Sequence, residues 1–183
     1  MSIIDTLIQR NVAFSKNGFN ADLKIMPPTQ KVMIIGCVDP RCDPADIFGL
    51  KHGEAAVIRN VGGRINPPTL QALGLVRTVG KNIGVTIGPG WNLIVLHHTD
   101  CGITPCLHHA PELLAKNLGV TVEGLNDLAI SDPYKAVAID IAALKANPLL
   151  PPGMMVTGLV YDVATGLVDT VVPTGLLRPE DPA

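Results

Sequence analysis

Two short polar segments of the chain carry side chains that commonly bind metal ions. One is "CVDPR", which begins at Cys37, and the other is "HTDCG", which begins at His98 and contains Cys101. Two thiolates and one imidazole form a ligand set that suits Zn²⁺ and leaves one of its four tetrahedral positions open. An open position is typical of a catalytic zinc site, because water bound there becomes more acidic. The residue types therefore predict a zinc enzyme with Cys37, His98 and Cys101 as ligands.

A carboxylate beside such a metal could orient the resulting hydroxide. Asp39 lies two residues after Cys37, and Arg41 follows two residues later, close enough for a charge-assisted pair that holds the carboxylate in place. Asp39 could instead occupy the open metal position itself, which would switch the enzyme off. An ordinary ion pair within a turn is the alternative interpretation of the same two residues.

The elements that precede these segments determine whether they can meet. Continuous apolar runs at 32–36, 55–58 and 92–96 each end in a polar cluster. Continuous runs favour strands that are covered on both faces, as in a parallel sheet. Ligands in such sheets bind beyond the carboxyl ends of the strands. If the three strands are parallel neighbours, their clusters converge. Gly62 and Gly63, after the second run, are expected in a tight turn, where missing side chains could also admit a small substrate.

The rest of the chain predicts an alternation of helices and strands. An apolar face in residues 3–8 indicates a first helix, which "MPPT" at 26–29 stops. Residues 67–81 and 132–146 have helical spacing, with prolines at their starts. Residues 154–173 are expected to form two strands around the turn "ATG", and the C-terminal "RPEDPA" is expected to fray.

Composition limits the classes of function. The 183 residues fit a single domain, 47% are apolar and 16% are charged, so another subunit could cover part of the surface. A net charge of −2 without a cluster of basic residues argues against nucleic acid and anionic membranes as partners. No apolar run approaches the roughly 18 residues of a membrane span. The N-terminus lacks the pattern of a signal peptide, so a cytoplasmic location is expected.

The four cysteines fall into two C-x4-C pairs, and they leave a rival open. Cys37, Cys42, Cys101 and Cys106 could together hold a structural zinc ion or form disulfides. A reducing compartment favours metal binding or catalysis over disulfides. A four-cysteine module would leave His98 without a role. Packing without a chemical role is the expected function of Cys42 and Cys106.

Taken in order, "CVDPR", "VIRNVGGRI" and "HTDCG" resemble the motifs of the β-class carbonic anhydrase family. The motifs span 31–102, and the order of elements fits to about residue 172. The resemblance implies a four-stranded, mostly parallel sheet flanked by helices within one domain, 1–183. It also implies an N-terminal helical arm, 1–25, that lies over the partner in a homodimer or larger homo-oligomer.

The resemblance also implies the chemistry. It places Zn²⁺ on Cys37, His98 and Cys101, makes Asp39 and Arg41 a catalytic dyad, and suggests that CO₂ is hydrated to bicarbonate. Plant-type members have a substrate-contacting glutamine nine positions before the first zinc cysteine, where this chain has Pro28. Relatives on the same scaffold hydrolyse carbonyl sulfide (COS) or carbon disulfide (CS₂), so these two molecules are alternative substrates.

Several nearby residues are expected to be structural. His97 should point to the opposite face of the sheet from His98, because side chains alternate along a strand. Asp43 and Pro44 are typical of a helix N-cap and first turn. "HH" at 108–109 is expected to be a solvated pair.

Overall fold

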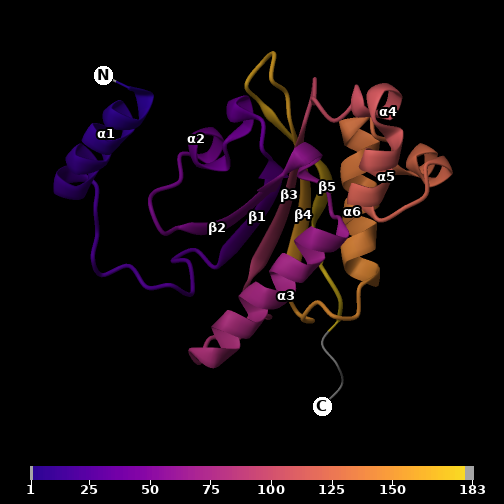
Figure 1. Cartoon of the computed structure of the whole chain (residues 1–183). Helices are drawn as coiled ribbons and strands as arrows, with labels where there is room; N and C mark the ends of the chain where they lie inside the picture. The colour runs from indigo at the N-terminus through magenta and orange to yellow at the C-terminus, as the bar shows by residue number, and fades with distance from the viewer. Residues whose placement is uncertain (1, 180–183) are drawn as a thin grey trace.

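Five strands form one sheet in the computed structural model, which describes residues 2–179 (Figure 1). The strands are β1 (Val32–Cys37), β2 (Ala55–Asn60), β3 (Asn92–His98), β4 (Met155–Tyr161) and β5 (Val168–Leu176), in the spatial order β2-β1-β3-β4-β5. The first four are parallel to one another, and β5 is antiparallel to β4. The predicted α/β fold with a mostly parallel sheet is confirmed.

The sheet has one strand more than the family resemblance implied. The additional strand, β5, is the second arm of the hairpin that the sequence predicted around "ATG", and it lies at the edge of the sheet. The turn closes where the N–H of Gly166, at φ +75°, donates to the carbonyl of Asp162. This backbone conformation favours glycine.

The helices are α1 (Ile3–Asn17), α2 (Pro44–Phe48), α3 (Pro67–Asn82), α4 (Cys106–His109), α5 (Pro111–Leu118) and α6 (Pro133–Ala146), with 3₁₀ turns η1 (Pro40–Cys42), η2 (Val61–Gly63) and η3 (Glu123–Leu128). Helices α1, α2, α3 and α6 begin where the sequence signals predicted, whereas α4 and α5 were not predicted. The Asp43 carboxylate accepts from the backbone N–H of Ala45 and caps α2, as predicted. Asp132 likewise caps α6, with proline in the first turn.

The main core lies on one face of the sheet. Leu73 of α3 and Val137, Ile141 and Leu144 of α6 pack there with the buried side chains of the central strands. The opposite face has a much smaller cluster, built on Ile34, Leu96 and Leu159. The second face is thus thinly covered within one chain.

The first helix stands apart from the sheet (Figure 1). None of the residues of α1 is buried, and Ile3, Ile4 and Ile8 are 67%, 59% and 58% exposed. The helix ends at Asn17, earlier than predicted, because Gly18 caps it with an N–H donated to the Phe14 carbonyl. Within residues 2–179, no helix is long and apolar enough to cross a membrane.

The C-terminal segment is partly anchored. Residues 180–183, the end of the segment expected to fray, lie outside the described residues. Arg178, at its start, donates to the carbonyl of Leu150, and its own carbonyl accepts from the N–H of Gly153. The segment therefore does not fray from its first residue.

Candidate metal centre

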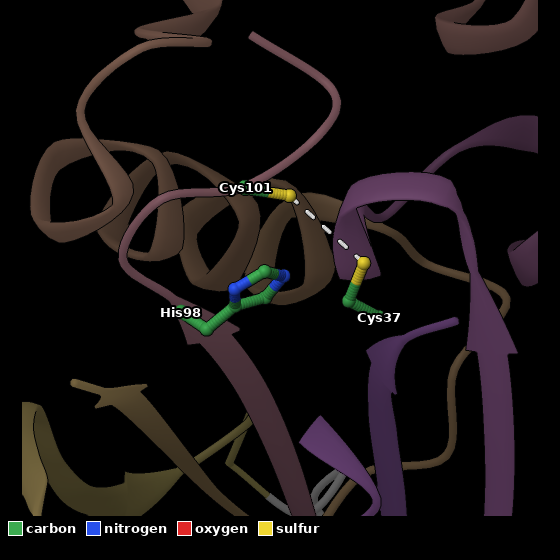
Figure 2. Close-up of side chains that lie close together, drawn as sticks. All are labelled: Cys37, His98 and Cys101. Carbon is green, nitrogen blue, oxygen red and sulfur yellow. Dashed lines mark hydrogen bonds between the residues drawn. The ribbon is translucent and has the colours of Figure 1, made fainter. Parts of the chain in front are cut away.

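The carboxyl ends of the three central strands meet, as the sequence predicted. Cys37 at the end of β1 is in register with Asn60 of β2, and Gly36 is in register with Leu96 of β3. The register places the segments after β1, β2 and β3 at the same edge of the sheet. Figure 2 shows the three predicted metal ligands drawn together there.

The three candidate ligand side chains form a compact group. A ligand atom of each of Cys37, His98 and Cys101 lies within 4.8 Å of those of the other two. The two sulfur atoms are 3.9 Å apart. Two thiolates on one tetrahedral Zn²⁺ lie about 3.8 Å apart, given Zn–S bonds of about 2.3 Å. The sulfur positions therefore fit a shared metal ion.

The imidazole of His98 has a free, buried nitrogen. Its Nδ1 lies 2.8 Å from the carbonyl oxygen of Thr99, so Nδ1 carries the proton and donates it. Nε2 is buried and has no hydrogen-bond partner within the described residues. A buried nitrogen without a hydrogen-bond partner destabilises the fold, and a metal ion bound to its lone pair would remove this penalty.

The thiols of Cys37 and Cys101 have pKa values that are shifted in opposite directions. The hydrogen bond from the Cys101 thiol, assisted by His98, lowers the pKa of Cys37 to about 4. The same contact with Cys37, together with burial, raises the pKa of Cys101. A thiolate beside a free imidazole nitrogen is the form in which these side chains bind Zn²⁺. The residues at this site therefore fit the metal that the sequence predicted.

The Asp39 carboxylate is held by Arg41 on both of its oxygens. Nε of Arg41 donates to Oδ1 at 3.1 Å, and Nη2 donates to Oδ2 at 2.8 Å. These hydrogen bonds hold the pKa of Asp39 at about 2, so the side chain is ionised at neutral pH. Arg41 also donates to the side chain and the carbonyl of Asp100, which precedes Cys101. The arginine thus connects the two ligand-bearing loops.

Arg59, at the end of β2, fixes the loop that follows β1. Its guanidinium donates to the carbonyls of Cys37 and Asp39, each at 2.8 Å, and to the Asp43 carboxylate at 2.6 Å. The sequence analysis placed Arg59 in a polar strand-end cluster and gave it no role of its own. A basic residue just before "NVGG" at a strand end is the signal that could have found it.

The two glycines of η2 have different surroundings. The N–H of Gly62 donates to Sγ of Cys37 at 3.3 Å, and Gly62 lines a neighbouring cavity. A Cβ at Gly63 would lie 3.0 Å from the backbone nitrogen of Cys37. Both residues have positive φ, as expected for the predicted tight turn. Only Gly62 is in a position to approach a small molecule from this cavity.

A buried ionic network lies directly behind the candidate ligands. The Asp140 carboxylate of α6 accepts from Nε and Nη2 of Arg64 at 2.9 and 3.1 Å, and lies 3.1 Å from Nε2 of His97. His97 has the structural environment that was predicted for it. Burial raises the pKa of Asp140, but His97 and Arg64 outweigh it and lower the value. The sequence analysis missed Arg64 and Asp140, although a lone aspartate in the apolar helix "AVAIDIAAL" was a usable signal.

The other two cysteines differ in their distance from the site. Cys42 is buried beside Asp39 and His98, within 4.8 Å of both, and burial raises its thiol pKa to about 11. Cys106 belongs to no candidate metal group of the described residues. All four cysteines are free thiols, and their sulfurs do not form one four-cysteine group. His108 and His109 are exposed, as predicted.

Pro28 lies at the wrong end of β1 to contact the site of its own chain. Its carbonyl accepts from the N–H of Lys31, directly before the strand, whereas Cys37 ends the strand. A strand of this length spans about 17–20 Å. Position 28 therefore lies about one strand length from the candidate ligand Cys37 of its own chain.

Comparison with known proteins identifies the family to which this site belongs. The family model described as "Carbonic anhydrase" matches residues 32–133, which contain all three candidate ligands. The chain is a β-class carbonic anhydrase family member. The match covers the strands and loops that carry the sequence motifs, so the resemblance on which the prediction rested is confirmed.

Individual relatives agree with this assignment. Beta-carbonic anhydrase 1 of Mycobacterium tuberculosis is 29% identical over 175 residues, which cover 94% of this chain and 100% of that protein. A crystal structure of carbonic anhydrase from Streptococcus mutans superposes with a TM-score of 0.70 at 34% identity, covering 93% of this chain and 98% of the other. A carbon disulfide hydrolase from Acidianus is 22% identical over 167 residues, 78% of each chain. The relatives of this carbonic anhydrase family member thus include enzymes for two different substrates.

Proposed function

We propose that this chain is a zinc-dependent carbonic anhydrase that hydrates CO₂ to bicarbonate, with Cys37, His98 and Cys101 as the zinc ligands. The observation that carries the proposal is the convergence of two sulfurs and an unpartnered imidazole nitrogen, all within 4.8 Å. When bound, Zn²⁺ would acidify a water molecule and so supply a nucleophile at neutral pH. Family membership supports the same reaction class.

Asp39 and Arg41 would position the attacking water. The carboxylate, ionised at neutral pH, accepts hydrogen bonds, and Arg41 fixes its orientation through both oxygens. A carboxylate with a pKa near 2 is a poor store for the proton that hydration releases, so that proton must pass on to solvent or buffer. Asp39 is therefore proposed to orient the water, and to become a metal ligand only when Arg41 releases it.

Arg59 and the glycines of η2 would maintain this geometry. Arg59 binds the carbonyls on both sides of Val38, and Gly62 donates its N–H to the sulfur of Cys37. A hydrogen bond to a thiolate ligand lowers its basicity and fixes its direction. Gly62 is the proposed contact for substrate at the cavity, while Gly63 allows η2 to pack against the backbone of β1.

Hydrolysis of COS or CS₂ is the second candidate. It is favoured by the similarity to the carbon disulfide hydrolase from Acidianus. These molecules are linear and weakly polar, as CO₂ is, and discrimination among such similar substrates is expected to be modest, about ten- to a few hundred-fold for each feature of the pocket. The four-cysteine module is not favoured, because Cys106 lies outside the candidate metal groups of the described chain.

We also propose that the chain acts as a homodimer or larger homo-oligomer, in which residues 1–25 form an arm over the partner. The exposed apolar side chains of α1 and the thin covering of the second sheet face support this assembly. On this proposal residues 1–183 form a single domain, of which residues 1–25 are the arm.

A direct test measures metal content and three rates on the purified protein. Elemental analysis should find about one zinc per chain, and stopped-flow assays should find rapid CO₂ hydration. The same preparation should be assayed on COS and CS₂ at matched concentrations. Rapid turnover of COS or CS₂ without CO₂ hydration would replace the first candidate by the second, and the absence of zinc would contradict both.

A further inference from the structure

The turn between β4 and β5 lies beside the loop that follows β3. Strands β3 and β4 are parallel, and His98, the last residue of β3, is in register with Tyr161, the last residue of β4. The two strands therefore end at the same level, and the residues that follow them are neighbours. Thr99, directly after the candidate ligand His98, contacts Asp162, which begins the hairpin turn 63 positions later in the chain.

The hairpin holds Thr99 through both its backbone and its hydroxyl. The N–H of Thr99 donates to the carbonyl of Tyr161 at 3.0 Å. Its hydroxyl donates to Oδ1 of Asp162 at 3.2 Å and accepts from the N–H of Val163 at 3.0 Å. A residue whose polar groups are all engaged in this way is fixed relative to the sheet.

The remaining polar group of Thr99 is its carbonyl, which contacts Nδ1 of His98 at 2.8 Å. Figure 2 shows the ring of His98 beside Cys37 and Cys101. A carbonyl fixed at Nδ1 sets both the tautomer of the ring and the direction in which Nε2 points. The placement of this carbonyl therefore determines how well Nε2 is aimed at a metal ion bound to the two sulfurs.

The carboxylate of Asp162 is itself fixed by the hairpin turn. Its Oδ1 also accepts from the N–H of Ala164 at 2.9 Å, and its Oδ2 accepts from the hydroxyl of Thr165 at 3.0 Å. An aspartate that binds the backbone N–H two residues later is typical of a tight turn. Among the described residues, Thr99 is the only partner of this carboxylate outside its own turn. Asp162 thus connects the turn to the loop that carries the candidate ligands.

We infer that Thr99 and Asp162 are positioning residues for the metal centre, which orient His98 as a ligand through the Thr99 carbonyl. The inference rests on the proposed function, because it requires that His98 binds Zn²⁺. Asp162 belongs to no candidate metal group of the described residues, so it acts on the metal only through Thr99 and His98. Loss of a group that orients a metal-binding histidine typically weakens metal binding by about ten- to a hundredfold.

Thr99→Val tests the inference directly, because valine keeps the branched shape of threonine and removes the hydroxyl. Zinc affinity, measured by competition with a chelator, should fall about tenfold. The visible spectrum of the cobalt-loaded variant should differ from that of the parent, because the imidazole is held less firmly. Thr99→Ser restores the hydroxyl and should recover both the affinity and the spectrum. Parental zinc affinity in a folded Thr99→Val variant would overturn the inference.

Thr165→Val is the matched control, because it removes a hydrogen bond to the same carboxylate without changing Thr99. Both variants should lower the free energy of unfolding of the metal-free protein, measured in urea, since each loses a hydrogen bond of the hairpin. Only Thr99→Val should lower zinc affinity. Equal loss of zinc affinity in the two variants would show that the hairpin acts through stability alone, and would contradict the positioning role.

Asp162→Ala decides the question if Thr99→Val does not fold. It removes the acceptor of the Thr99 hydroxyl and should also weaken zinc binding, and in the double variant the two losses should not add, because both changes break the same hydrogen bond. Parental zinc affinity in Asp162→Ala, or additive losses, would contradict the inference. A parent protein that binds no zinc would contradict the proposed function and this inference together. A parent that binds zinc without hydrating CO₂ would contradict the proposed reaction alone.

Discussion

At the scale of single residues, the site depends on which atoms are left without partners. His98 uses Nδ1 on the Thr99 carbonyl and keeps Nε2 free, while Cys37 and Cys101 face each other at 3.9 Å. If these residues served packing alone, their buried polar atoms would be expected to have hydrogen-bond partners within the protein. Their arrangement therefore has a physical explanation in metal binding, which packing alone does not give.

The four cysteines should divide into two classes when each is replaced. Cys37→Ser and Cys101→Ser should each lose most of the zinc, because an alcohol is a much poorer Zn²⁺ ligand than a thiolate. Cys42→Ser and Cys106→Ser are the matched controls and should keep about one zinc per chain. Metal content after dialysis, measured by elemental analysis, decides the matter. Equal loss from all four variants would favour the four-cysteine module instead.

Arg41→Ala should separate metal binding from activity. The arginine holds both oxygens of Asp39 but is not a metal ligand, so zinc content should remain near one per chain. CO₂ hydration should fall by about a hundredfold or more, because the released carboxylate is no longer oriented and can occupy the open metal position. Stopped-flow rates compared with elemental analysis test this, and Arg10→Ala, an arginine of α1, is the control. If Arg41→Ala hydrates CO₂ as fast as the parent protein, the role proposed for Arg41 is wrong.

The candidate ligand residues could be predicted from the sequence, whereas the residues that support them could not. Cysteine, histidine and aspartate at strand ends have few other uses in that pattern, and the structure brings the three ligand candidates together. Arg59 and Arg64 act through partners that are distant in the chain, such as Asp140, 76 positions beyond Arg64. A pairing of this kind depends on tertiary structure, which a local pattern does not specify.

At the scale of elements, the parallel strands and α6 together position the site. The apolar runs predicted β1, β2 and β3, and the prolines with their capping residues predicted α3 and α6 closely. The end of α1 was predicted less well, because a glycine cap at Gly18 stops the helix before the prolines do. Asp140 of α6 contacts His97 at the end of β3 and accepts a hydrogen bond from Arg64 in the loop after β2.

The contacts of Asp140 with His97 and Arg64 should make the folded chain less stable as the pH falls into the acid range. The pKa of Asp140 is lower in the folded chain than the value of about 3.9 expected when unfolded. Its ionised form therefore stabilises the fold above about pH 4, and this contribution is lost as the pH falls toward the lower folded pKa. Asp140→Asn should cost about 3 kcal/mol at pH 7, because the Arg64 charge is left buried without its partner.

The difference in the free energy of unfolding between the parent and Asp140→Asn should become smaller as the pH falls from 5 to about 3. Urea unfolding at several pH values measures it, and loss of zinc in acid is common to both proteins and cancels in the comparison. Asp169→Asn, which changes an exposed aspartate that accepts from Tyr134, is the control and should cost little at any pH. A constant difference across the whole range would show that the ionisation of Asp140 does not stabilise the fold.

At the scale of the whole molecule, a single chain exposes apolar side chains to solvent. The side chains of Ile3, Ile4, Leu7 and Ile8 lie along one face of α1, and each is at least 48% exposed. The second sheet face is also thinly covered within one chain. A contiguous exposed apolar face of this kind is typical of an interaction site. A second copy of the chain is the proposed cover.

Removing residues 1–24 should therefore lower both assembly and solubility. In sedimentation velocity the full chain should behave as a dimer or larger species, and the truncated chain should shift toward the monomer, because the contact surface of α1 is lost. A milder variant, Ile4→Glu with Ile8→Glu, should have the same effect by placing charges on the apolar face. Gln9→Glu with Ala13→Glu adds the same charge to the opposite face of the helix and should leave assembly unchanged. A full-length chain that sediments as a monomer at micromolar concentration would contradict the proposed assembly, since no partner would then cover the helix.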